Sequence, residues 1–168
     1  RVGVMTPQVF EEDKFVLKME FVDGARLKDV IDGKNYKNIA RKIGEKIAVL
    51  HNYNIIHGDL TTSNMIMKAM ENDDPTQTNK KPKNGKKDTS DNFELYFIDF
   101  GLGFFSSRIE DKATDIHLLK EALESTHFDV LDKMWKIIVD AYKGGYHDGE
   151  KVIKTLSKIE KRGRYAER

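Results

Sequence analysis

The clearest pattern in the chain is an apolar stripe between residues 36 and 52. Ile39, Ile43, Ile47 and Leu50 recur at three-to-four-residue spacing. This is the period of one face of an α-helix, and the charged residues fall elsewhere on the helical wheel. The pattern predicts a core helix over Tyr36–Asn52 that delivers the chain to the segment around residue 57.

The same period predicts three further helices, over residues 114–123, 128–142 and 149–162, with Gly144 and Gly145 ending the second. Their expected inward residues are Ala113, Ile116, Leu119 and Leu123; Val130 or Leu131, Met134, Trp135, Ile138 and Ala141; and Val152, Ile153, Leu156 and Ile159. These helices and the stripe of residues 36–52 predict a mainly helical body.

Shorter apolar runs predict strands. Residues 9–10 and 15–19 read as a hairpin around a polar turn, and residues 26–31 as the start of a short helix. Ile55-Ile56 and the run from Met65 to Lys68 read as strands that flank a tight loop, and residues 93–98 read as another strand.

Residues 69–92 interrupt this pattern with Asn, Asp, Lys, Thr and Pro and hardly an apolar side chain. Such a segment cannot bury enough surface to offset the entropy of ordering it. We interpret it as a disordered insertion between two strands. The alternative is that its lysine clusters, at 80–83 and 86–87, read RNA or a signal.

Candidate chemistry lies where two apolar runs each end in an acid. The first run leads into His57-Gly58-Asp59-Leu60-Thr61-Thr62-Ser63-Asn64, and the second into Asp99-Phe100-Gly101. Asp59 can accept a proton from a hydroxyl group, and Asn64 and Asp99 offer oxygen ligands to a hard cation such as Mg²⁺. This spacing is typical of phosphoryl transfer. We interpret His57 as structural, packed under Asp99 and Phe100, and the histidines at 51, 117, 127 and 147 as ordinary.

Composition narrows the class further. A chain of 168 residues suffices for one domain with a core, and a formal charge of +1 argues against a protein that coats nucleic acid. The absence of cysteine excludes a disulfide scaffold. No apolar run approaches a membrane span, so we expect no membrane association and a cytoplasmic or nuclear location.

These motifs resemble the protein-kinase superfamily, with its H-x-D-L-x-x-x-N catalytic loop and D-F-G motif. The run from His57 to Asn64 more narrowly resembles the small atypical kinase family of the KEOPS complex, which helps to make threonylcarbamoyl-adenosine on transfer RNA. Residues 3–7, the short segment 99–115 and the basic residues 158–164 support this resemblance.

The resemblance implies an α+β, protein-kinase-like fold, mainly the helical C-terminal lobe with the last strands of a truncated N-terminal lobe. Residues 1–22 would be the end of the N-lobe and the hinge, and residues 23–168 the C-lobe, with the insertion at 69–92 and a basic C-terminal tail. Residues 151–168 carry seven Lys or Arg against two acids, a balance of +5 (seven minus two).

The resemblance also assigns roles to individual residues. Asp59 matches the catalytic base, and Asn64 and Asp99 match the magnesium ligands. The residues expected to hold ATP are Met19, Glu20, Val22, Asn64, Ile66, Ile98 and Asp99, with Met19–Val22 as the hinge. Asp115 either holds main-chain amides of the catalytic loop or is a simple helix-start acid.

Three departures from the kinase pattern modify this expectation. Gly58 stands where many kinases have Arg, no Ala-Pro-Glu follows Asp99, and no Gly-rich loop or strand lysine precedes Arg1. We therefore expect a fragment that lacks most of the smaller lobe and is inactive by itself.

The resemblance implies an ATP- and Mg²⁺-dependent serine/threonine phosphotransferase or ATPase that acts as a KEOPS subunit in transfer-RNA modification. Its expected partners are the tRNA-modifying catalytic subunit, a small subunit that binds the N-lobe, and transfer RNA at the basic tail. Three alternatives stay open at this stage: a kinase-like scaffold without essential catalysis, a RIO-type ribosome-maturation kinase, and a small-molecule kinase of the aminoglycoside or choline type.

Overall fold

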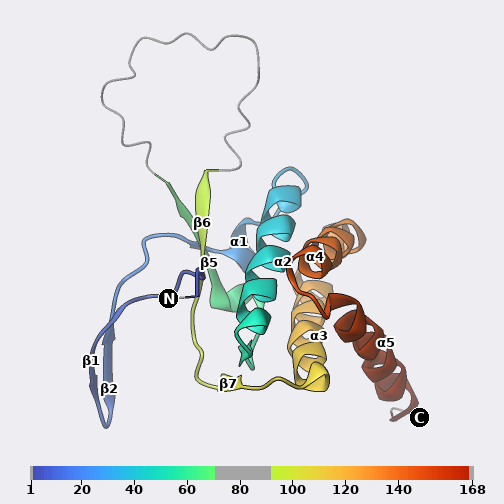
Figure 1. Ribbon diagram of the computed structural model, residues 1–168. Coiled ribbons are helices and arrows are strands. Elements are labelled where there is room, and N and C mark those ends of the chain that lie inside the picture. The colour runs from blue at the N-terminus through green and yellow to red at the C-terminus, as the bar shows by residue number, and fades with distance from the viewer. Residues whose placement is uncertain (1, 71–91, 167–168) are drawn as a thin grey trace.

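The computed structural model describes residues 2–70 and 92–166 and shows a helical body flanked by short strands (Figure 1). Most of the predicted insertion, residues 71–91, lies outside the described residues. The strands are β1 Val9–Asp13, β2 Val16–Met19, β3 Ala25–Arg26, β4 Ile55–Ile56, β5 Met65–Ala69, β6 Phe93–Phe97 and β7 Phe104–Phe105. The helices are α1 Leu27–Val30, α2 Tyr36–Asn52, α3 Ile109–Thr126, α4 Leu131–Gly145 and α5 Gly149–Ala166.

Helix α2 is the centre of the core and packs against α4. The predicted helix has the expected bounds, and all four residues of its apolar stripe are buried. Gly44 permits the close approach of the two helices. A Cβ atom at this position would collide with the Ile138 carbonyl oxygen and lie 2.8 Å from the Ala141 side chain. Within residues 2–70 and 92–166, no helix is both long and apolar enough to span a membrane.

The strands around the catalytic loop form two small antiparallel sheets. One has the order β3–β5–β6, and Met5 extends it through a bridge to Tyr96. The other pairs β4 with β7, so that Ile55 faces Phe105 and Ile56 faces Phe104. These pairings bring residues 55–64 and 98–105 together, although about forty residues separate them in the sequence.

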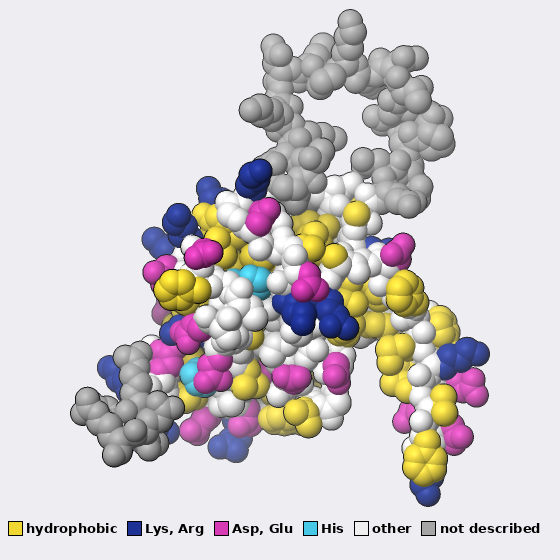
Figure 2. Space-filling model, turned by 180° about the vertical axis from the view of Figure 1, so that it is seen from behind, with side chains coloured by type: hydrophobic (Ala, Val, Ile, Leu, Met, Phe, Trp, Pro, Cys, Tyr) yellow, Lys and Arg dark blue, Asp and Glu magenta, His cyan; other side chains and the backbone are white. Residues whose placement is uncertain are grey.

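The hairpin β1–β2 stands apart from the body (Figure 1). Its two strands pair as predicted, with the turn at Lys14–Phe15. Figure 2 shows apolar side chains along this arm. The large exposed apolar residues of the arm and its connection are Val9, Phe10, Phe15, Val16, Leu17, Met19 and Phe21. The division of the chain into lobes at residue 22 stays a prediction.

Three predicted boundaries were wrong. Arg26 belongs to strand β3, because its backbone pairs with Ile66, and the helix begins one residue later. Helix α3 begins at Ile109 rather than 114, and the acids Glu110 and Asp111 in its first turn favour that start through the helix dipole. Phe128 lies in a 3₁₀ turn before α4 and is exposed.

Candidate functional site

The loop between β4 and β5 carries the central acid. Gly58 begins it with φ +81°, a left-handed conformation that glycine adopts without strain. A Cβ atom here would also lie 2.7 Å from the Leu102 carbonyl carbon. The fully buried Leu60 and a 3₁₀ turn over Thr62–Asn64 fix the other side of the loop. The backbone therefore holds Asp59 at a sharply defined position.

Asn64 contacts Asp59 directly. Its side-chain amide nitrogen donates to the Asp59 carboxylate over 2.8 Å and to the Asp59 carbonyl oxygen over 3.0 Å. Because one end of the amide group is directed to Asp59, its oxygen is directed elsewhere. This orientation suits a residue that must both hold an acid and offer an oxygen ligand.

Asp99 follows β6 and is exposed, with φ +61°. The Ile98 N–H donates to the Asn64 carbonyl oxygen over 3.0 Å, which places Asp99 beside the catalytic loop. Among residues 2–70 and 92–166, no group of three or more His, Cys, Asp or Glu residues could hold a metal ion. A pair made of Asn64 and Asp99 is consistent with Mg²⁺ bound mainly by waters and substrate phosphates.

His57 supports this region from below, as predicted. Its Nε2 atom lies 3.1 Å from the Ile98 carbonyl oxygen, and its ring centroid lies 4.4 Å from that of Phe100. The Asp59 N–H donates to Nδ1 over 3.3 Å, which assigns the ring proton to Nε2. Burial lowers the pKa of His57, although the Asp115 carboxylate opposes the shift.

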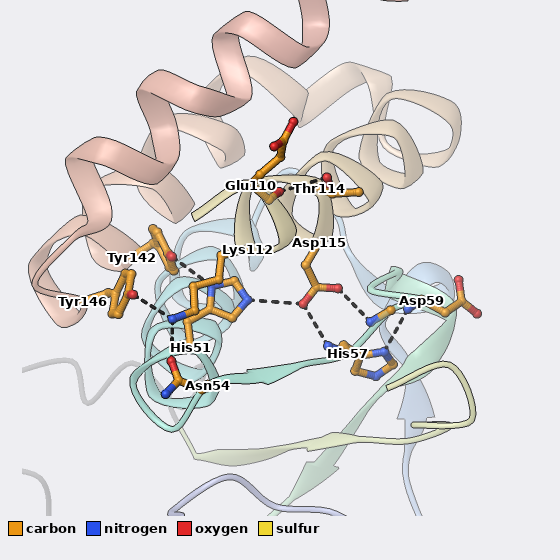
Figure 3. Close-up of polar contacts among 11 residues, drawn as sticks. His51, Asn54, His57, Asp59, Glu110, Lys112, Thr114, Asp115, Tyr142 and Tyr146 are labelled. Atoms are coloured by element: carbon orange, nitrogen blue, oxygen red, sulfur yellow. Dashed lines mark hydrogen bonds and ion pairs between the residues drawn. The ribbon is translucent and has the colours of Figure 1, made fainter. Parts of the chain in front are cut away.

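Asp115 reaches the catalytic loop from the second turn of α3 (Figure 3). Its carboxylate accepts the His57 N–H over 3.0 Å and the Gly58 N–H over 2.9 Å. It is therefore not a helix-start acid, and the first of the two predicted roles is confirmed. These contacts fix the backbone immediately before Asp59.

The interpretation of His51 as ordinary was wrong. His51 is fully buried at the end of α2, with Nε2 3.3 Å from the Asp115 carboxylate and Nδ1 2.8 Å from the Tyr142 hydroxyl oxygen. Burial raises the pKa of Tyr142, so its hydroxyl stays protonated and donates to Nδ1. The other nitrogen then donates to Asp115 (Figure 3). A signal was present in the sequence, because His51 follows Ile47 by four residues and so continues the apolar stripe.

The expected nucleotide-binding residues lie on three segments. Met19 ends β2 and is 46% exposed, and residues 20–22 connect the hairpin to the body, where Val22 is buried. The Glu20 N–H donates to the Gln8 carbonyl oxygen over 2.8 Å. Ile66, in β5, and Ile98, directly after β6, are both half-buried. Their common role in binding ATP stays a prediction.

A shallow groove of about 460 Å³ lies between the catalytic loop and the outer part of α3. Its lining residues are Thr61, Thr62, Ser63, Leu118, Glu121, Ala122, Ser125 and Thr126. The first of these follows Asp59 by only two residues. The groove therefore offers a hydroxyl-rich surface next to the candidate catalytic acid.

Solved structures with the same fold are kinases or kinase-like proteins by title. The chain aligns with WaaP in complex with acyl carrier protein at a TM-score of 0.66 and 11% identity, over 98% of this chain and 70% of that one. It aligns with the Rio2 kinase–ADP/Mg²⁺–phosphoaspartate complex from Chaetomium thermophilum at a TM-score of 0.56 and 15% identity, over 98% of this chain and 50% of that one. The model of the RIO domain family matches residues 1–73. The protein therefore has a protein-kinase-like fold of mixed helices and strands.

Sequence relatives narrow the class. The chain is 36% identical to the KEOPS complex subunit Bud32 of Pyrococcus abyssi, over 99% of this chain and 68% of the relative. It belongs to the Bud32 family. It is also 34% identical to a probable bifunctional tRNA threonylcarbamoyladenosine biosynthesis protein of Methanosarcina mazei, where it covers 99% of this chain but spans only 25% of that relative.

Proposed function

We propose that this protein is an ATP-dependent phosphotransferase or ATPase that works as a KEOPS subunit in the threonylcarbamoyladenosine modification of transfer RNA. The observation that carries the proposal is the meeting of Asp59, Asn64 and the Asp99 segment at one point of the fold. The names of the Bud32 relative and the bifunctional relatives supply the biological context.

In this proposal Asp59 orients the attacking hydroxyl group or water molecule and accepts its proton. A positioned general base of this kind contributes roughly 10²–10⁴-fold in rate. Asn64 holds the Asp59 carboxylate through its amide nitrogen, and its oxygen and the Asp99 carboxylate would hold Mg²⁺. Mg²⁺-bound ATP supplies the phosphoryl group and the neutralising charge that this chemistry needs.

The nucleotide would lie between the hinge and the strands that lead into the site. The Glu20 N–H is engaged by Gln8, so we expect Glu20 to contact the adenine through its carbonyl group and Val22 through its N–H. Met19 would lie behind the base, and Ile66 and Ile98 would form the apolar floor. The groove beside Asp59 is the proposed approach for the acceptor.

Transfer RNA and the KEOPS subunits are the proposed partners, in the cytoplasm or the nucleus. Lys154, Lys158 and Lys161 are exposed along α5, and such positive charge favours phosphate contacts. Other basic groups of this helix are paired within the protein: Lys151 with Asp148, and Arg162 with Glu110 over 3.6 Å. The side chain of Arg164 and all of Arg168 lie outside the described residues.

The kinase-like scaffold is the competing proposal, since the relatives' names state a complex and a pathway rather than a reaction. The test is ATP hydrolysis by the protein with the KEOPS catalytic subunit and transfer RNA, comparing the wild type with Asp59→Asn and Asp99→Asn. Asp140→Asn, at an exposed acid on α4, is the matched control. Loss of hydrolysis and of RNA modification in the two site variants alone supports catalysis. Full RNA modification by both site variants would support the scaffold.

A further inference from the structure

Lys112 is a buried cation that the proposed chemistry does not use. It lies on α3, is 1% exposed, and is surrounded by polar groups from two other segments. Its amine donates to the Asn54 side-chain oxygen over 2.8 Å and to the Tyr146 hydroxyl oxygen over 2.8 Å. The same amine lies 4.8 Å from the centre of the Tyr146 ring, at cation–π distance. A buried lysine is retained only where its hydrogen bonds are satisfied, which is the case here.

Asn54 is the turn residue that starts β4. Its backbone has φ +58°, a left-handed conformation that is strained for most residues and tolerated by asparagine. Its carbonyl oxygen accepts the Ser106 N–H over 2.8 Å, which joins the turn to the segment that follows Asp99. The hydrogen bond from Lys112 fixes the side chain of this turn.

Lys112 and Asp115 are three residues apart on one face of α3 and contact opposite ends of the same short segment (Figure 3). Lys112 holds Asn54 before β4, and Asp115 holds the His57 and Gly58 amides after it. Only Ile55 and Ile56 lie between these two contacts. Asp59 follows directly, so its position depends on both contacts.

We propose that Lys112 is a positioning residue, which acts through Asn54 and Tyr146 to hold the segment that delivers Asp59. In this arrangement α3 and the end of α4 set the start of β4, and Asp115 sets its end. Loss of the Lys112 contact frees the turn and lets the loop move relative to the Asp99 segment. The effect on turnover rests on the proposed function, whereas the effect on loop mobility does not.

The test compares Lys112→Met, which keeps most of the apolar stem, with Asn54→Gly, which tolerates the left-handed turn but lacks the side-chain acceptor. Amide hydrogen exchange is measured at His57 and Gly58, and at α2 as a reference. We expect each variant to speed exchange at the two loop amides by about tenfold while α2 stays protected. The double variant should add little to either single one, because both remove the same contact.

Lys120→Met is the matched control. Lys120 lies on the same helix but pairs with Glu160 of α5 over 2.6 Å, so its loss should leave the loop amides unchanged relative to α2. ATP turnover gives a second readout: Lys112→Met should lower kcat about tenfold with KM for ATP within about twofold.

Unchanged exchange at His57 and Gly58 in both variants, or faster exchange spread evenly over all helices, would overturn the proposal. Faster local exchange in a protein whose wild type does not turn over ATP would support the positioning role and count against the proposed function.

Discussion

The side-chain amide nitrogen of Asn64 lies 2.8 Å from the Asp59 carboxylate, across a loop of five residues. The same nitrogen also binds the Asp59 carbonyl oxygen, so the hydrogen bonds determine which way the amide group faces. One residue thus orients the candidate base and presents an oxygen to a cation. These two roles can be separated by substitution.

Asn64→Asp keeps an oxygen ligand but removes the donor and places a second negative charge against Asp59. We expect kcat for ATP hydrolysis to fall by roughly 10²-fold, because the hydrogen bond that orients the base becomes a repulsive contact. The Mg²⁺ concentration needed for half-maximal activity should not rise. Steady-state kinetics over a Mg²⁺ titration makes this measurement.

Asn64→Ala is the comparison for that variant, because it removes both the donor and the ligand. It should lower kcat and also raise the Mg²⁺ requirement. An equal rise in the Mg²⁺ requirement for Asn64→Asp and Asn64→Ala would contradict the separation of the two roles.

Gly58→Ala should disrupt the catalytic loop. It combines a left-handed backbone of φ +81° with a clash against the Leu102 carbonyl group, and we expect it to lower the free energy of unfolding by about 1–3 kcal/mol. Urea denaturation measures the change. Gly3→Ala is the control, since Gly3 has φ +79° but nothing within 4 Å of the added Cβ atom. An equal loss in both variants would show that the contact with Leu102 contributes nothing.

Much of the fold could be predicted because local patterns decide it. The stripe from Ile39 to Leu50 is dictated by helical period alone, and the bounds of α2 follow from it. The pairing of Asp59 with Asn64 was equally accessible, since a tight loop between two short strands brings them together. The nearby arrangement of Asp115 required a family resemblance, because 56 positions separate it from Asp59.

The polar network behind the loop was missed for a physical reason. A hydrophobicity pattern treats His51, Lys112 and Tyr142 as surface residues, although helical spacing places each beside core residues. Lys112 precedes the buried Ile116 by four positions, so its burial was visible as a face but not as a partner. Partners on α2, α3 and α4 meet only through tertiary packing, which no local pattern specifies.

Tyr142→Phe tests this network. It leaves the buried Nδ1 atom of His51 without the hydroxyl donor, and an unsatisfied buried polar atom costs about 1–3 kcal/mol. We expect a loss of unfolding free energy in this range, measured by urea denaturation. Tyr53→Phe, at a side chain that is 58% exposed, should cost less than about 0.5 kcal/mol. A Tyr142→Phe protein as stable as the wild type would show that the hydroxyl is not a needed donor.

The buried histidines predict a dependence of stability on acid. Burial lowers the pKa of His51, His57 and His127, so the folded protein resists protonation that the unfolded chain accepts near its ordinary pKa of about 6.5. As the pH falls below that value, the unfolded state binds more protons, and the free energy of unfolding decreases until the folded histidines titrate. Above it, these residues add no pH dependence. Urea denaturation between about pH 8 and pH 5 should therefore show a falling stability that His51→Gln makes less steep. His147→Gln, at an exposed ring, is the control for the substitution itself. A slope that His51→Gln leaves unchanged would assign the acid sensitivity to groups other than His51.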